Sequence, residues 1–194
     1  MDEPFDLSIH ADLNFTEVLC THFPRNPMQQ QQSERNTAFL TTLPILHNMF
    51  IDCNDVIDMQ WIEKQTSLTG DVKWDGVAFL IKNKFVIPLF VELSGGINCN
   101  SGTEKARDDE EKMIRQLIKL LKLKKAEGSE LPHQYYIRYH DLKIYFESLF
   151  YFGEYYVKRT YFELVCPTTP KELKTFVEKI PYLFQYHQAL HDQI

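Results

Sequence analysis

The most constraining feature of this sequence is Phe85–Val91, a run of seven residues without a single polar side chain. A strand that lacks alternating polar residues is covered on both faces, which is typical of a central strand in an α/β sheet. Pro88 removes one main-chain donor and indicates a bulge or an unpaired section within the run. Glu92 follows directly, so the sequence predicts a carboxylate at the end of a buried strand.

A second apolar run, Val77–Ile81, precedes the first and is joined to it by Lys82–Lys84, which reads as a turn. We therefore expect the two runs to form a hairpin. Further strands are predicted at 134–139, 142–152 and 155–165, and an ambiguous segment at 57–68 is either strand or helix. Helices are predicted at 34–50 with a kink at Pro44, at 104–126, and after Thr169–Pro170 with a restart at Pro181.

This order of elements predicts an α/β fold, a central mixed sheet flanked by helices. Residues 1–35 contain three prolines and the run Gln29–Gln32, which is typical of a flexible N-terminal arm. Residues 36–194 have the length of a single α/β domain. The clearest helix is 104–126, because acidic residues fill its first turns, lysines fill its last turns, and Met113 and Leu117 begin an apolar stripe.

Charge and cysteine content exclude several classes of protein. The chain has 21 Lys and Arg against 27 Asp and Glu, a net charge of −6, which leaves room for a local basic surface only. No apolar run approaches the roughly 20 residues that cross a bilayer, and the acidic start Met1–Pro4 lacks the features of a secretory signal. Four cysteines at wide, irregular spacing argue against disulfides. We expect an intracellular protein, cytoplasmic or nuclear, with no membrane partner.

Two acidic residues stand out as a candidate catalytic pair. Asp75 precedes the first strand of the predicted hairpin, and Glu92 ends the second strand, 17 residues later. If the strands pair, the two carboxylates converge at one end of the sheet. Such oxygen ligands suit Mg²⁺ or Mn²⁺, and a cation held there can activate water for phosphodiester hydrolysis. The less specific alternatives are a turn role for Asp75 and a structural ion pair of Glu92 with Lys73 or Lys84.

These residues resemble a known family. Asp75, the hairpin and Glu92-Leu93-Ser94 are similar to the Asp…(Asp/Glu)-x-Lys core of the PD-(D/E)XK, or restriction-endonuclease-like, nuclease superfamily. The segment 61–181 also resembles uncharacterised fungal proteins with the patterns Asp-Gly-x-Ala-Phe and Val-Glu-x-Ser-Gly-Gly. The resemblance implies a restriction-endonuclease-like fold and metal-dependent cleavage of DNA or RNA.

The same resemblance assigns roles to single residues. Asp75 and Glu92 match the two metal-binding acids, and Glu63 could match a further acid before the hairpin. Ser94 stands where the superfamily has its catalytic Lys. Some families supply that Lys from the next helix, where Lys105 and Lys112 are the candidates. As ordinary residues, these two lysines and Glu63 would be solvated surface charges.

The departure at Ser94 keeps a second function open, a catalytically inactive nuclease-fold domain that binds nucleic acid or protein, or forms a homodimer. The aromatic residues of the last three strands allow either a buried sheet face or a stacking surface for single-stranded nucleic acid. Among the seven histidines, only His187 and His191 have a spacing that suits a metal on one helix face. We expect that pair to lie on an exposed helix end.

Overall fold

The fold is a six-stranded mixed sheet with helices on both faces, which confirms the predicted α/β class. The computed structural model describes residues 17, 19–20, 24–97, 103–129 and 132–194. The strands follow one another across the sheet in chain order. Their bounds are Ile57–Lys64 (β1), Trp74–Leu80 (β2), Leu89–Leu93 (β3), His133–His140 (β4), Lys143–Phe152 (β5) and Tyr155–Val165 (β6).

Helices frame the sheet in two layers. Their bounds are Glu34–Leu40 (α2), Thr42–Met49 (α3), Thr103–Ala126 (α4), Pro170–Val177 (α5) and Ile180–His191 (α6), with 3₁₀ turns at Pro27–Gln29 (η1) and Ile51–Cys53 (η2). All strand pairs are antiparallel except β3 and β4, which are parallel and are connected through α4. A parallel pair needs a long crossover of this kind, because its second strand must begin at the same end of the sheet as the first.

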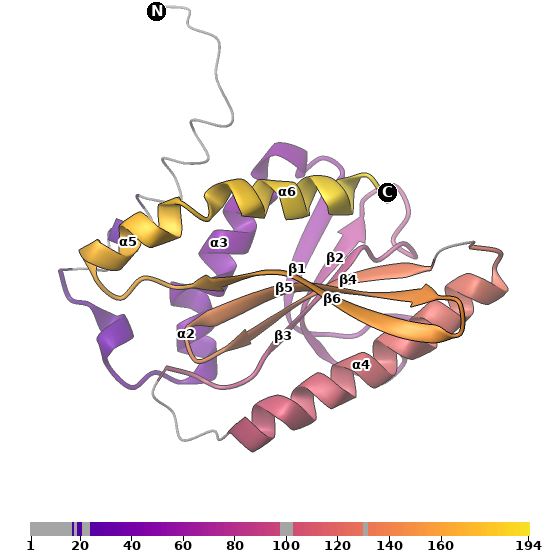
Figure 1. The fold of residues 1–194 in the computed structure, drawn as a ribbon, viewed down its shortest axis with the longest axis horizontal. Coiled ribbons are helices and arrows are strands. Elements are labelled where there is room, and N and C mark those ends of the chain that lie inside the picture. The colour runs from indigo at the N-terminus through magenta and orange to yellow at the C-terminus, as the bar shows by residue number, and fades with distance from the viewer. Residues whose placement is uncertain (1–16, 18, 21–23, 98–102, 130–131) are drawn as a thin grey trace, which may run out of the picture.

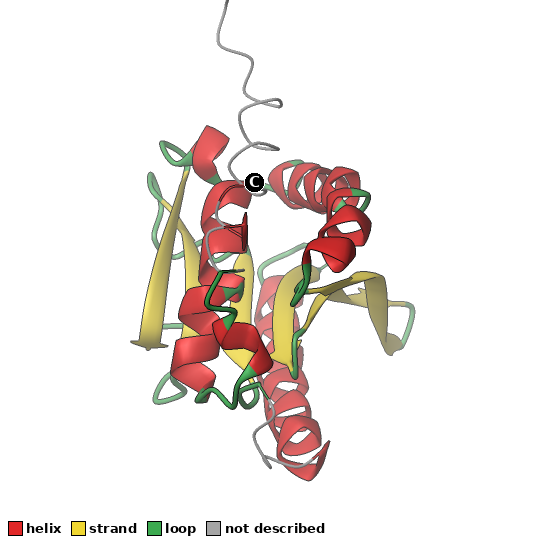
Figure 2. Ribbon diagram, turned by 90° about the vertical axis from the view of Figure 1, so that its left-hand side faces the viewer, coloured by secondary structure: helices red, strands yellow, loops and turns green. Residues whose placement is uncertain are grey.

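Each face of the sheet has its own apolar core. On one face, α4 packs Met113 and Leu117 against Phe90 and Tyr136. On the other face, α3 and α6 cover side chains from all of the inner strands. Figure 1 shows α4 and α6 on opposite sides of the strands. The sheet is twisted, so that in Figure 2 its two ends stand on either side of the N-terminal helices.

The predicted hairpin is confirmed, but its second strand is shorter than expected. β2 and β3 pair antiparallel with Gly76 opposite Val91. β3 begins only at Leu89, whereas Phe85 is 72% exposed. The reason is Pro88, which has no N–H to donate to a ladder, so regular pairing starts after it.

The helix predicted at 34–50 is two helices, and the break lies at Thr41 rather than at Pro44. Thr41 leaves helical geometry with φ −130° and ψ −77°, and its hydroxyl donates to the Thr37 carbonyl at 2.7 Å. Pro44 lies in the first turn of α3, where its missing N–H would have had no partner inside the helix. The ambiguous segment at 57–68 is strand β1 over Ile57–Lys64.

Most of the predicted N-terminal arm lies outside the described residues, as does Cys99. The part that is described contacts the domain: Met28 is buried, and the Gln32 amide donates to the Ile97 carbonyl at 3.0 Å. In the part of the chain that is described, no helix has both the length and the apolar character needed to cross a bilayer.

Candidate functional site

The strand register places the two predicted acids opposite each other. Gly76 pairs with Val91 and Val77 with Phe90, so one position further along the same ladder Asp75 stands opposite Glu92. Directly opposed residues on antiparallel strands point to the same face, with Cβ atoms about 5 Å apart. The face is the one covered by α4, because Val77 and Phe90 pack in the α4 core. The predicted convergence of Asp75 and Glu92 thus follows from backbone pairing.

Asp75 closes the end of the β2–β3 ladder. Its Oδ2 accepts a hydrogen bond of 2.8 Å from the Leu93 amide. Burial raises the pKa of Asp75, while this hydrogen bond and the charge of Lys112 offset part of the rise. The Leu93 amide therefore fixes the carboxylate in position, although burial disfavours its charged form. A turn residue on the surface would show neither feature.

Glu92 is the most perturbed acid of the site. The residue is 8% exposed, and its Oε1 lies 3.6 Å from Lys112 Nζ on α4. Burial raises its pKa to about 8, and the charges of Asp75 and Asp109 act in the same direction against the attraction of Lys112. The structure thus assigns Lys112 as the ion-pair partner of Glu92, in place of the Lys73 or Lys84 considered from sequence.

A third acid joins this end of the sheet from a distant part of the chain. Glu34, the first residue of α2, accepts a hydrogen bond of 2.7 Å from the Gly95 amide in the loop after β3. The same Oε2 lies 2.7 Å from Lys105 Nζ. The hydrogen bond to Glu34 raises the pKa of Lys105. Both predicted lysines therefore lie at the acids, Lys112 at Glu92 and Lys105 at Glu34.

Glu63 occupies a different kind of environment. Its side chain is 52% exposed and forms ion pairs with Lys73 at 2.9 Å and Arg35 at 3.2 Å. The hydrogen bond from Lys73 lowers the pKa of Glu63. Glu63 sits in a bulge of β1 with φ +50°, so its side chain leaves the regular strand alternation.

A cavity of about 190 Å³ opens beside these acids. It lies between α2 and the strand ends, and the acids that line it are Glu34, Glu63 and Asp75, with Trp61 and Leu93 as apolar wall. The three oxygen donors Glu34, Asp75 and Glu92 are spread too widely to form a closed cluster, because among the described residues only Asp52, Cys53 and His187 bring three ligand atoms within 4.8 Å of one another. An open set with one or two carboxylates suits Mg²⁺ or Mn²⁺, which keep most of their water ligands.

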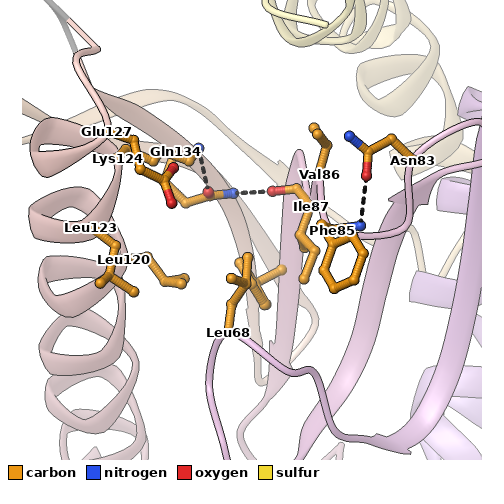
Figure 3. Close-up of a pocket in the computed structure, with 11 residues that line it drawn as sticks. Leu68, Asn83, Phe85, Val86, Ile87, Leu120, Leu123, Lys124, Glu127 and Gln134 are labelled. Atoms are coloured by element: carbon orange, nitrogen blue, oxygen red, sulfur yellow. Dashed lines mark hydrogen bonds between the residues drawn. The ribbon is translucent and has the colours of Figure 1, made fainter.

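A larger cavity, of about 420 Å³, lies away from the acids. Figure 3 shows it between the C-terminal part of α4 and the segment 83–87, with Gln134 bridging its floor. The Gln134 amide donates to the Ile87 carbonyl at 3.0 Å and accepts from Lys124 Nζ at 2.9 Å. Its walls are mainly apolar and hold no carboxylate pair, so the larger cavity does not extend the acidic site.

Most aromatic side chains of β4–β6 belong to the cores rather than to a stacking surface. Tyr136, Tyr139 and Phe146 are fully buried. Two cations of these strands, Arg138 and Lys158, are paired with Glu110 and Glu147. Exposed rings gather at the β5–β6 turn, at Phe152 and Tyr155.

Glu34 is the site residue that sequence reasoning missed. Local sequence signals only that it opens a helix after the cap Ser33, whose hydroxyl accepts from the Asn36 amide. Its contact with Gly95 spans 61 residues and depends on how α2 packs. No periodicity or spacing reports such a contact.

Comparison of the chain with protein-family models, with curated proteins and with solved structures finds no match. The function must therefore be argued from the site itself.

Proposed function

We propose that this chain is a metal-dependent nuclease that hydrolyses phosphodiester bonds in DNA or RNA, on a restriction-endonuclease-like fold. The observation that carries the proposal is the pair of half-buried Asp75 and buried Glu92, opposed on β2 and β3 with Lys112 at 3.6 Å from Glu92. The helix α4, which follows Glu92 and leads to the parallel strand β4, lies where the resemblance to PD-(D/E)XK nucleases also implies a helix.

The acids bind the cation in this proposal. Asp75 and Glu92 hold Mg²⁺ or Mn²⁺, and Glu34 takes the role of the further acid that the sequence gave to Glu63. The preference for Glu34 rests on its contact with the loop after Glu92, whereas Glu63 is half exposed and already paired with two cations. A bound cation supplies Lewis acidity toward the phosphate and lowers the pKa of a water ligand.

Lys112 replaces the missing lysine at position 94. Ser94 is 6% exposed and offers no positive charge. Lys112 reaches the acids from the neighbouring helix, and its ammonium can orient the attacking water and stabilise charge on the phosphate. Lys105, held by Glu34 at 2.7 Å, is the second cation at the mouth of the site and suits a contact with the nucleic-acid backbone.

The test is cleavage of end-labelled single-stranded DNA, duplex DNA and RNA with Mg²⁺ or Mn²⁺. We expect cleavage by the wild type, its loss in Asp75→Asn and Glu92→Gln, and no effect of Glu163→Gln, an exposed acid paired with Lys143 on the β5–β6 side of the sheet. Equal cleavage by wild type and both acid variants would overturn the proposal.

The second function is a nucleic-acid-binding or protein-binding domain without catalysis. Ser94 at the lysine position favours it, together with the net charge of −6. A nucleic-acid-binding domain predicts binding of the same probes without cleavage, and binding that does not change in Asp75→Asn. A protein-binding domain predicts neither binding nor cleavage of these probes. A gel-shift series on the same variants separates the two functions.

A further inference from the structure

A second cluster of side chains that can bind a metal lies between η2 and α6 and shares no residue with the Asp75–Glu92 site. Cys53 Sγ is 3.2 Å from His187 Nε2, and the same nitrogen is 3.6 Å from Asp52 Oδ1. All three ligand atoms lie within 4.8 Å of one another. The sequence predicted an exposed helix end for His187, and that prediction is wrong: His187 is 7% exposed and packs edge-on against Phe50.

We propose that Asp52, Cys53 and His187 form a zinc-binding site. Thiolate, imidazole and carboxylate are the three side-chain ligand types of zinc proteins, whereas Mg²⁺ and Mn²⁺ prefer oxygen alone. The proposal is independent of the nuclease function, because it shares no residue with the Asp75–Glu92 site.

The distances suit a tetrahedral ion. With Zn–S near 2.3 Å and Zn–N and Zn–O near 2.1 Å, tetrahedral angles give about 3.6 Å between sulfur and nitrogen and about 3.4 Å between nitrogen and oxygen. The observed separations are 3.2 and 3.6 Å, so these two pairs need shifts of only a few tenths of an ångström to hold the ion. The sulfur and the carboxylate oxygen lie within 4.8 Å of each other and would close on the same ion. His191, one helical turn beyond His187 and exposed, or a water molecule can supply the fourth ligand.

The geometry argues against a cysteine nucleophile. In a catalytic triad the thiol and the acid bind different nitrogens of the imidazole. Here the sulfur and the carboxylate both face Nε2. Convergence of three ligand atoms on one point is the arrangement of a metal site. The side chain of Asp52 is 26% exposed, so an ion can enter the cluster from solvent at Asp52.

The test is titration of the metal-free full-length protein with Co²⁺, followed by displacement with Zn²⁺. We expect one Co²⁺ per chain to bind with a thiolate-to-cobalt charge-transfer band in the near ultraviolet and with the strong visible bands of a tetrahedral ion. Zn²⁺ should abolish both. Cobalt bound at Asp75 and Glu92 has only oxygen ligands and gives no thiolate band, so the two sites are distinguished by one spectrum.

Variants identify the ligands. Cys53→Ser should remove the charge-transfer band, and Asp52→Asn and His187→Gln should weaken Co²⁺ binding at least about tenfold. The matched controls are Cys20→Ser and His47→Gln, which alter an exposed cysteine and an exposed histidine. A wild-type spectrum without the thiolate band would overturn the proposal, and so would a band that persists in Cys53→Ser. The wild-type spectrum alone shows whether a thiolate binds the cobalt ion. The proposal can therefore be overturned even if a variant fails to fold.

Discussion

At the scale of single residues, Glu92 shows what a sequence can and cannot reveal. Its position directly after an apolar run predicts a carboxylate that is costly to bury, and the structure confirms the burial. The ion-pair partner of Glu92 could not be predicted from the sequence, because the choice among Lys73, Lys84 and Lys112 depends on how α4 packs. Burial and then the charge of Asp75 raise the pKa of Glu92, whereas Lys112 lowers it and Asp109 raises it further from α4, a helix more than ten residues away.

The first prediction concerns stability and pH. An unfolded chain releases the Glu92 proton near pH 4.5, whereas the folded chain holds it to about pH 8. The folded state therefore binds more protons in this window, and the free energy of unfolding falls as pH rises from about 4.5 to about 8. Glu92→Gln removes this cost and should be more stable than the wild type at pH 9, by on the order of a few kcal/mol. Urea unfolding at pH 5 and pH 9 without divalent cations measures the difference.

The matched control for that measurement is Glu163→Gln, which alters an exposed acid. Parallel pH dependence in the wild type and in Glu92→Gln would contradict the account of Glu92.

The second prediction concerns Lys112. Lys112→Met removes the positive charge nearest to Glu92 and should lower the cleavage rate about 10²-fold or more. It should also move the pH–rate profile to higher pH, since Lys112 holds the pKa of Glu92 down. Lys119→Met, an exposed lysine two turns further along α4, is the control and should leave the profile unchanged. A lower rate with an unmoved profile would mean that Lys112 acts without influencing Glu92.

At the scale of elements, local patterns predicted the hairpin, the long helix and the succession of helices and strands along the chain, because each of these depends on neighbours in the sequence. They misplaced the start of β3 and the break between α2 and α3. The apolar residues before Pro88 do not join β3, because Pro88 has no N–H to donate to the neighbouring strand. At Thr41 the hydroxyl donates to the carbonyl of the preceding turn, and the helix ends there although the composition of the segment favours its continuation. The role of α2 in presenting Glu34 depends on tertiary packing and could not be predicted.

The third prediction tests the contact that positions α2. Gly96 lies against the main chain before α2, and a Cβ at Gly96 would meet the Gln32 carbonyl oxygen at 1.9 Å. Gly96→Ala must push this backbone away and should lower the free energy of unfolding by about 1–3 kcal/mol. Chemical denaturation measures the loss. Gly153→Asn, in an open turn with φ +62°, is the control and should be close to neutral. A neutral Gly96→Ala would show that the segment before α2 adapts freely.

At the scale of the whole molecule, segments from the early and late parts of the described chain pack together over one face of the sheet. Leu19, α3 and α6 share one core, although they lie at opposite ends of the sequence. The sequence predicted a single α/β domain of this class, but it could not predict which helices share a face. That arrangement places His187 against Cys53, 134 residues earlier in the chain.

The fourth prediction follows from the contact between His187 and Cys53. A zinc ion that binds only the folded state stabilises it by about 2.7 kcal/mol at a hundredfold excess over its dissociation constant. For a chain of this size the melting temperature should rise by roughly 5–10 °C. Differential scanning calorimetry with and without Zn²⁺ measures the shift, and Cys53→Ser should not show it. An equal shift in Cys53→Ser would place the stabilising ion elsewhere.

The central claim, that Asp75 and Glu92 meet around one divalent cation, is tested most directly by Mn²⁺ binding followed by electron paramagnetic resonance. The account predicts saturable binding that is lost in Asp75→Asn and in Glu92→Gln and kept in Asp52→Asn. Binding that survives both Asp75→Asn and Glu92→Gln, or a wild-type protein that binds no Mn²⁺, would contradict it.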